Sequence, residues 1–196
     1  MGDEPKRAER IVPLPEERQR LLEVLTAGPD PLYAVLDAAR DLRALNWLKE
    51  SGTEYASLYD GKSAVDLEMF APYLARLEKD ANVLRKLLAE AWGQSWGIYL
   101  TSPVSLAELR KHFRHFLMVE MEGQSGKTFY FRFYDPRVLR TYLPTCTSQE
   151  ARIFFGPIGS YLLEDEDPSS LCQYRVGARG VERETTRLEK GDVPHP

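Results

Sequence analysis

Large apolar side chains occupy every second position in the stretch KTFYFRFY, where Phe129, Phe131 and Phe133 alternate with Tyr and Arg residues. A period of two residues is that of a β-strand, so the pattern predicts a core strand with these rings on one face. Burial of each ring stabilises the fold by roughly 1.5–3 kcal/mol. Asp135 and Pro136 follow directly, and these residue types cap and begin helices. We therefore expect a strand, a sharp corner and a helix that folds back.

The period changes to that of a helix after this corner. Leu139 and Leu143 lie at helical spacing, and Pro144 is expected to end the helix. The rest of the chain shows the same two periods in alternation. Ser63 is expected to cap a short helix, and residues 69–77 form either a strand or a loop. Further helices are predicted over 16–27, 41–51, 82–92, 105–113 and 148–155, and further strands over 32–37, 55–59, 95–101 and 116–122.

This alternation of helices and strands predicts an α/β fold. We expect a mixed β-sheet of about five strands with helices packed on it, plus a small helical C-terminal part. Residues 1–31 are interpreted as an N-terminal extension with one helix, and residues 32–163 as the main domain. Residues 164–196 are acidic and then of mixed charge, with few large apolar side chains to offset the entropy of ordering. We expect that tail to be weakly ordered.

Composition narrows the class of protein. The chain has 196 residues, of which 43% are hydrophobic, and this is enough for a core. No apolar run approaches the roughly 18–20 residues of a membrane span, and the N-terminus lacks the apolar region of a secretory signal. The formal net charge of −4, without a long basic block, argues against a nucleic-acid partner. Cys146 and Cys172 are too few for a disulfide framework and are expected to be reduced cytosolic thiols.

Two short motifs suggest chemical sites, but each has a simpler interpretation. Residues 123–128, GQSGKT, end like a phosphate-binding loop, yet position 121 is Met and a strand follows, so we expect a hairpin turn. His112 and His115 have the spacing of a metal pair on one helix face, but no Cys or carboxylate pattern completes a site. We expect His115 to be half-buried, His112 to be solvated, and no metal or cofactor to bind.

Charged residues near predicted strand ends are the remaining candidates for chemistry. Asp37, Asp41 and Asp60 lie near such ends, where carboxylates can be catalytic but are also ordinary caps and turn formers. Arginines cluster near the corner at Asp135, and a guanidinium binds carboxylate or phosphate through two parallel hydrogen bonds. The commoner role of such a group is structural: Arg132 or Arg137 would then pair with Asp135 and fix the corner.

Six segments of the chain together resemble a known family. They are LYAVLDAARD, LYDGKSAVDLEMFAPYLARL, WGQSWGIYLTS, LRKHFRHFL, FRFYDPRVLRTYLPTC and FFGPI, in this order. The set resembles the bacterial type VI secretion effector adaptor (chaperone) family, long catalogued as a domain of unknown function. The resemblance spans about Leu32 to Leu163, and its FRFYDPRVLRTYLP and WGIYLTS segments are specific.

The resemblance implies a cytoplasmic protein without catalytic activity. Family members bind a cognate toxic effector and promote its loading onto VgrG, the valine-glycine repeat spike protein at the tip of the injection apparatus. They are not secreted with their cargo. The expected partners are therefore the N-terminal segment of an effector and the VgrG spike, with no nucleic acid and no membrane.

The residues expected to contact the effector lie at the arginine-rich corner: Arg132, Tyr134, Arg137 and Arg140. Apolar contacts would supply affinity, and the arginines would orient the partner. The alternative is an enzyme that acts on a small phosphorylated or carboxylated metabolite near Asp60 and the Arg132–Arg140 corner. A nucleic-acid-binding module is a third option, which the acidic balance disfavours.

Overall fold

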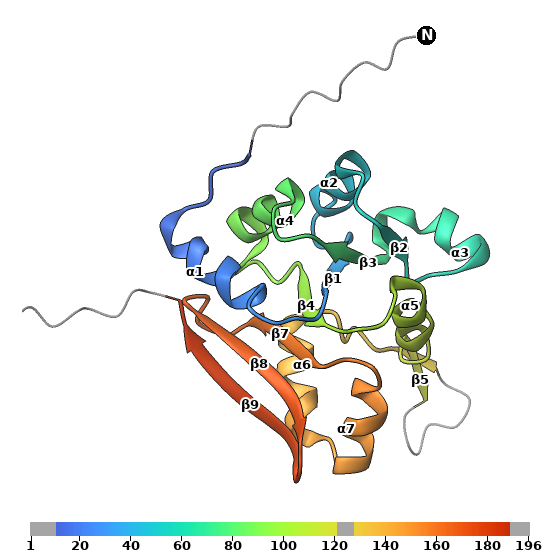
Figure 1. The fold of residues 1–196 in the computed structure, drawn as a ribbon. Coiled ribbons are helices and arrows are strands. Elements are labelled where there is room, and N and C mark those ends of the chain that lie inside the picture. Colours follow the sequence, from blue (N-terminus) through green and yellow to red (C-terminus); the bar gives the residue numbers. More distant parts are fainter. Residues whose placement is uncertain (1–10, 121–127, 189–196) are drawn as a thin grey trace, which may run out of the picture.

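One antiparallel β-sheet crosses the molecule from side to side (Figure 1). A computed structural model describes residues 11–120 and 128–188, and within these it places seven strands in this sheet, in the order β2-β3-β1-β4-β7-β8-β9. The strands are β1 (Leu32–Asp37), β2 (Tyr55–Ser57), β3 (Pro72–Leu77), β4 (Gly97–Thr101), β7 (Ser160–Glu164), β8 (Ser170–Gly177) and β9 (Gly180–Arg187). A separate hairpin consists of β5 (Met118–Glu120) and β6 (Thr128–Tyr130).

The α/β class is confirmed, but a mixed sheet of about five strands was the wrong expectation. Each pair of neighbours in the sheet is antiparallel. The reason lies in how the crossovers are arranged. Because β1 and β2 are both antiparallel to β3, they are parallel to each other, yet β3 lies between them. Likewise, β3 and β4 are both antiparallel to β1 and hence parallel to each other, and β1 lies between them. The alternation of helices and strands does reflect crossovers between parallel strands, but a third strand is inserted into each one.

Helices cover both faces of the sheet, which gives three layers (Figure 1). The helices of the first face are α1 (Glu16–Leu25), α2 (Arg43–Ser51) and α4 (Asn82–Lys86), the last continued by a π-helical turn over Leu87–Ala91. The helices of the second face are α5 (Leu106–Arg114), α6 (Pro136–Tyr142) and α7 (Ser148–Phe155). A further short helix, α3 (Gly61–Asp66), leads into a 3₁₀ turn, η1 (Glu68–Phe70). Among the described residues, no helix has the length and apolar character needed to cross a membrane.

The central strand β1 shows why the sheet is buried on both faces. All six of its residues are buried, as the run LYAVLD predicts. Leu32, Ala34 and Leu36 belong to the core on one face, whereas Tyr33 and Val35 belong to the core on the other. The alternation of the strand thus divides the apolar residues of the run between two helical layers.

Around Asp135, the predicted helix is confirmed, but the predicted core strand before it is not. β6 ends at Tyr130 and lies in the small hairpin, so the expected core strand through Phe133 does not form. Phe133 is nevertheless fully buried and stacks on Phe113 of α5 at 5.0 Å between ring centroids. Asp135 caps α6 as predicted, because its carboxylate accepts the backbone N–H of Arg137 at 3.0 Å. The turn expected at 123–126 lies outside the described residues.

The expectation of a weakly ordered tail from residue 164 onward is wrong for the described part. β8 and β9 form a regular antiparallel ladder and join the main sheet through β7. Leu171, Cys172 and Tyr174 of β8 are fully buried. Apolar residues are few in this region, but they alternate at positions that face the two cores. Composition alone conceals that pattern.

The N-terminal helix is likewise part of the main core. Leu21, Leu22 and Leu25 of α1 pack in the same apolar cluster as β1 and α4. Two smaller expectations concern helix starts. Ser105 and Glu108 form the predicted capping box of α5. Ser63 was the wrong cap for the short helix: α3 begins at Gly61, after Asp60.

Candidate functional site

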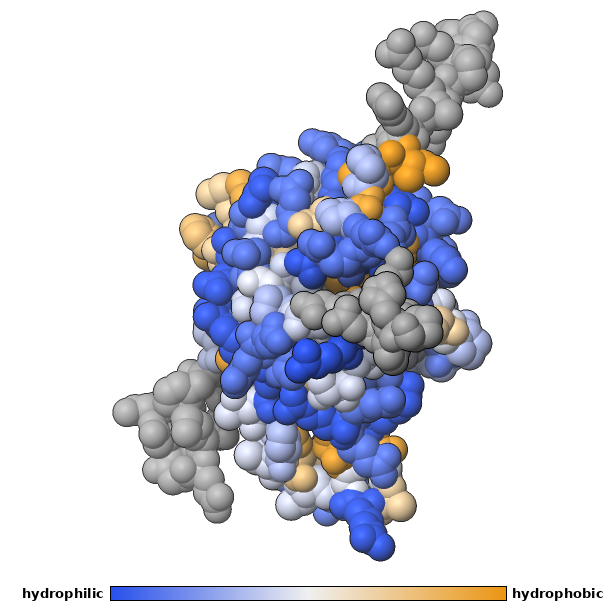
Figure 2. Space-filling view, turned by 90° about the vertical axis from the view of Figure 1, so that its left-hand side faces the viewer, coloured by the Kyte–Doolittle hydropathy of each residue, from blue (hydrophilic) through white to orange (hydrophobic). Residues whose placement is uncertain are grey.

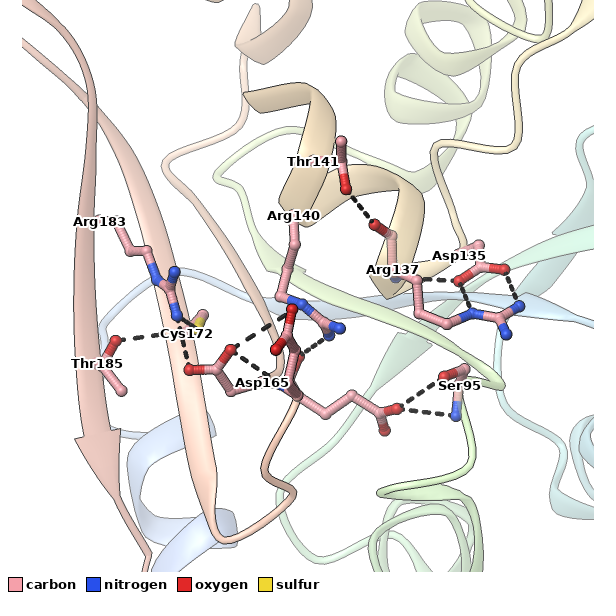
Figure 3. A network of polar contacts seen from close by, with 11 residues as sticks. Ser95, Asp135, Arg137, Arg140, Thr141, Asp165, Cys172, Arg183 and Thr185 are labelled. Carbon is pink, nitrogen blue, oxygen red and sulfur yellow. Dashed lines mark hydrogen bonds and ion pairs between the residues drawn. The ribbon is translucent and has the colours of Figure 1, made fainter. Parts of the chain in front are cut away.

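A polar groove of about 690 Å³ lies between α6, the β7–β8 loop and β9. We call it the α6 groove; its lining residues are Arg137, Arg140, Thr141, Asp165, Glu166, Asp167 and Arg183. Figure 3 shows Arg140 and Arg183 converging on Asp165 from α6 and β9, with Arg137 beside Asp135. The groove therefore presents three guanidinium groups, each already in contact with an oxygen atom of the protein.

Arg137 is held rigidly at the start of α6. Its Nε and Nη2 donate to the two carboxylate oxygens of Asp135 at 2.9 and 2.6 Å. Burial alone would raise the pKa of Asp135, but the hydrogen bonds and charge of Arg137 outweigh it, so the pKa lies below its ordinary value. The Arg137 side chain is still 51% exposed. One face of a fixed guanidinium is thus open to a partner.

Arg140 has a structural position. Its Nη1 donates to the backbone carbonyl oxygen of Glu164 at 2.7 Å, and its Nε lies 4.0 Å from Oδ1 of Asp165. Only 13% of the side chain is exposed. Arg140 therefore ties α6 to the end of β7, and a substitution there is expected to disturb the fold as well as the groove.

Arg183 brings the last strand to the groove. Its Nη2 donates to Oδ2 of Asp165 at 2.6 Å and lies 2.9 Å from Sγ of Cys172. Burial raises the pKa of the Cys172 thiol above its ordinary value, and Asp165 adds to the effect, so the thiol is protonated at neutral pH. Cys172 is consequently a buried neutral partner of Arg183. The Arg183 side chain remains 45% exposed.

Glu164, whose backbone carbonyl accepts the Arg140 hydrogen bond, has a buried carboxylate. Glu164 accepts the backbone N–H groups of Gly93 and Ser95 at 2.6 and 2.9 Å, and it also accepts the Ser95 hydroxyl at 3.0 Å. Burial raises the pKa of Glu164 above its ordinary value despite these hydrogen bonds. Gly93 and Ser95 both have positive φ angles, so Glu164 holds a tight turn that links β7 to the entry of β4.

Arg132 and Tyr134 are not among the residues that line the α6 groove. Nη2 of Arg132 donates to Asp37 at 2.5 Å, at the end of β1, where the Asp37 carboxylate is buried. Tyr134 is also buried, with its ring centroid 5.9 Å from the Arg132 guanidinium carbon. The structural alternative for the corner, in which Arg132 or Arg137 pairs with Asp135, is confirmed: Arg137 is the partner of Asp135, whereas Arg132 pairs with Asp37. Of the four predicted contact residues, Arg137 and Arg140 line the α6 groove, Arg132 is half-exposed beside Asp37, and Tyr134 is buried.

The remaining acidic candidates from the sequence form ion pairs within the protein. Asp60 contacts Arg114 at 2.7 Å, and Asp41 pairs with Arg43 at 2.8 Å. The two histidines have exchanged their expected environments: His112 is half-buried and hydrogen-bonded to the Phe154 carbonyl at 2.8 Å, whereas His115 is exposed. Helix α5 packs its His112 side against α7, which the spacing of apolar residues did not reveal. The described residues contain no cluster of His, Cys, Asp and Glu suited to a metal.

A second surface was missed in the sequence. Four large apolar side chains of α3, η1 and the residue between them are exposed, with Val65 at 76% and Phe70 at 56%. They are Val65, Leu67, Met69 and Phe70. The signal was present in the sequence, where apolar residues alternate with Asp66 and Glu68, but residues 69–77 were interpreted as one strand or loop. The strand begins only at Pro72.

Comparison with known families gives one match. Residues 32–152, more than half of the chain, match the model of the family described as "Domain of unknown function (DUF4123)". The chain belongs to the DUF4123 family. The DUF4123 match runs from β1 into α7, so it includes Arg137 and Arg140 but ends before β7, β8 and β9. Neither the curated proteins nor the solved structures give a significant match to the chain.

The DUF4123 assignment agrees with the resemblance of the sequence segments, because the matched residues contain nearly all of them. It is compatible with a role as a type VI secretion adaptor. The α6 groove is formed in part by the matched residues of α6 and in part by the later residues Asp165 and Arg183.

Proposed function

We propose that this protein is a non-catalytic adaptor (chaperone) of a type VI secretion system. It binds the N-terminal segment of a cognate toxic effector in the cytoplasm and promotes loading of that effector onto the VgrG spike. The observation that carries the proposal is membership of the DUF4123 family together with the α6 groove, in which two half-exposed guanidiniums are fixed by protein carboxylates.

The fixed guanidiniums suit recognition of a protein partner. An arginine that is already held by a carboxylate loses little side-chain entropy when a partner binds its open face. Arg137 and Arg183 meet this condition from two different elements, α6 and β9. Arginine is also enriched among the residues that dominate protein interfaces. The partner segment is expected to carry acidic or carbonyl groups that share these arginines with Asp135 and Asp165.

A second, more apolar groove lies on the other side of α6. It has a volume of about 680 Å³ and includes Val138 and Tyr142, both half-buried. Arg137 and Thr141 line both grooves. An effector segment that crosses α6 would thus combine apolar burial with arginine contacts, as specific interfaces commonly do.

Co-purification with the effector and VgrG proteins encoded beside this chain tests the proposal. We expect both to be retained by the wild-type protein. The double variant Arg137→Met, Arg183→Met should lose most of the effector, whereas Arg175→Met should not. Arg175 is a suitable control because it is 56% exposed on β8 but does not line the groove.

The fold of each variant is checked by its circular dichroism and melting temperature. Retention of a normal amount of effector by a folded double variant would remove the groove from the account. A thermal-shift screen of phosphorylated and carboxylated metabolites addresses the alternative of an enzyme. Strong stabilisation by one such compound, without any effector response, would contradict the adaptor proposal.

A further inference from the structure

The two edges of the sheet differ in how their backbone groups are used. The β2 edge is three residues long, and Arg110 of α5 donates to the carbonyl oxygens of Ser57 and Tyr59 at 2.6 and 2.9 Å. A side chain thus occupies that edge. The opposite edge is β9, which is eight residues long.

The register of the β8–β9 ladder identifies the free backbone groups of β9. In an antiparallel ladder, hydrogen bonds to the neighbour involve every second residue. Leu188 donates its N–H to Ser169, so the even-numbered residues of β9 bond to β8. The outward N–H and C=O groups are therefore those of Val181, Arg183, Thr185 and Arg187. Within residues 11–120 and 128–188, no hydrogen bond satisfies these outward groups.

Charge alternates along this open edge. Arg183 and Arg187 project from one face of β9, together with Thr185 and Val181. Glu182 and Glu184 project from the other face. The side of the molecule on which β9 lies is accordingly predominantly hydrophilic (Figure 2). Each face of the edge thus carries one sign of charge.

This pattern disfavours pairing with a second copy of the chain. If two β9 edges pair antiparallel, each residue lies opposite a residue of the same face in the copy. Glutamate then meets glutamate or threonine, and arginine meets arginine, threonine or valine, whatever the register. Like charges placed directly opposite are destabilising, and edge strands commonly use charge to prevent self-association.

We propose that the β9 edge accepts an extended segment of a partner protein whose acidic and basic residues alternate. The segment adds as an eighth, antiparallel strand, in keeping with the rest of the sheet. Its acidic residues lie opposite Arg183 and Arg187, and its basic residues lie opposite Glu182 and Glu184. Since Arg183 also lines the α6 groove, the acidic face of the added strand borders that groove. The inference concerns backbone pairing at β9 and does not depend on the partner being an effector.

A synthetic peptide that alternates Glu and Lys over ten residues tests this with the purified full-length chain. Calorimetry should detect binding, whereas a peptide of the same composition with all Glu before all Lys should bind at least about tenfold more weakly. N-methylation of the Glu residues removes the N–H groups that face β9 and should abolish binding. N-methylation of the Lys residues should be tolerated. Equal binding of the block peptide, or equal effects of the two methylations, would overturn the proposal.

Variants of the edge give a second readout. Thr185→Pro removes an outward N–H and is compatible with an edge strand, so it should abolish peptide binding without loss of melting temperature. Thr185→Val keeps the N–H and should bind normally. In a ¹⁵N spectrum, the peptide should shift the amides of Val181, Arg183, Thr185 and Arg187 more than those of the even-numbered residues. Shifts that favour the even-numbered residues, or a Thr185→Pro variant that folds and binds like wild type, would contradict strand addition.

Discussion

The two edges of the sheet differ: at one edge a side chain bonds to an outward backbone carbonyl oxygen, whereas at the other edge the described residues provide no such bond. At β2, the guanidinium of Arg110 bonds to the carbonyl oxygen of Ser57, which a neighbouring strand could otherwise use, and to that of Tyr59 just beyond the strand. At β9, the guanidinium of Arg183 turns onto one face of the sheet and bonds to Asp165, which leaves its own backbone groups pointing outward. Arginine therefore serves opposite purposes at the two edges, and the difference depends on whether it bonds to backbone or to side-chain oxygen.

The difference also follows the boundary of the family match. The β2 edge lies within residues 32–152, whereas β7, β8 and β9 lie beyond them. The α6 groove spans this boundary, because Arg137 and Arg140 come from the matched part and Arg183 from the later part. A binding surface assembled in this way can combine a feature of the family with one supplied by the C-terminal hairpin, which consists of β8 and β9. The following experiments test whether that hairpin is a firm part of the molecule and how the two edges differ.

The largest effect is expected from a cavity in the hairpin. Leu171→Ala in β8 should lower the free energy of unfolding by about 2–5 kcal/mol, because Leu171 is fully buried between β7 and the first helical layer. Leu100→Ala in the central strand β4 is the matched control, since Leu100 is equally buried. Urea unfolding should give similar losses for both. A loss below about 0.5 kcal/mol for Leu171→Ala would show that the hairpin is only loosely attached.

Loss of the Arg110 contacts at the β2 edge should lower the free energy of unfolding by a smaller amount. Arg110→Met leaves the carbonyl oxygens of Ser57 and Tyr59 without their donor, at a cost of about 1–3 kcal/mol. Arg114→Met removes a neighbouring arginine that, among the described residues, forms an ion pair with the exposed Asp60, so it should cost about 0–1 kcal/mol. Urea unfolding measures both. Equal losses of stability in the two variants would mean that Arg110 contributes through its charge and not through its hydrogen bonds to Ser57 and Tyr59.

Asp165, which lines the α6 groove, and the nearby carboxylates Asp135 and Glu164 predict a pH dependence of stability with two signs. Asp135 and Asp165 have folded pKa values below the ordinary 3.8, so their stabilisation is fully present above that pH and is lost as the pH falls through the lowered values. Glu164 has a raised pKa, so its contribution is present below 4.5 and is lost as the pH rises through the raised value. Urea unfolding between pH 7 and pH 2 should therefore show a steep acid limb, which Asp165→Asn should flatten. An unchanged limb in that variant would contradict the assignment to the groove.

The smallest effect on stability is expected at the exposed surface of α3 and η1. Met69→Ser and Val65→Ser should change the free energy of unfolding by less than about 0.5 kcal/mol, because both side chains are more than half exposed. Measurement of effector binding by these two variants tests whether the effector contacts this apolar surface or the α6 groove. Normal binding by these variants would leave the groove as the contact, whereas loss of binding would move the contact to α3 and η1.

Much of the local structure could be predicted from the sequence, because it depends on neighbouring residues. The buried run of β1, the capping box at Ser105 and the Asp135–Pro136 start of α6 are of this kind. The site could be predicted only in part. Asp135 and Arg137 are two residues apart and their pairing was among the alternatives, but the contacts of Arg132 with Asp37 and of Arg183 with Asp165 join distant segments. Only the tertiary fold determines which acid each arginine meets.

The C-terminal hairpin was misjudged for a related reason. Its outer strand β9 consists mainly of Glu, Arg and Thr residues, and this composition is also typical of weakly ordered segments. What orders β9 is pairing with β8, which in turn pairs with β7 and buries Leu171 and Cys172. An edge strand needs few apolar residues of its own, so its sequence carries a weak signal.

The affinity of the purified protein for the N-terminal segment of the effector encoded beside it tests the central claim most directly. Calorimetry should give a stoichiometric complex with the wild-type chain and with Arg175→Met. For the folded Arg137→Met, Arg183→Met variant, the dissociation constant should be at least about tenfold weaker, which corresponds to about 1.4 kcal/mol. Absence of binding by the wild-type protein, or equal affinity for the groove variant, would contradict the account.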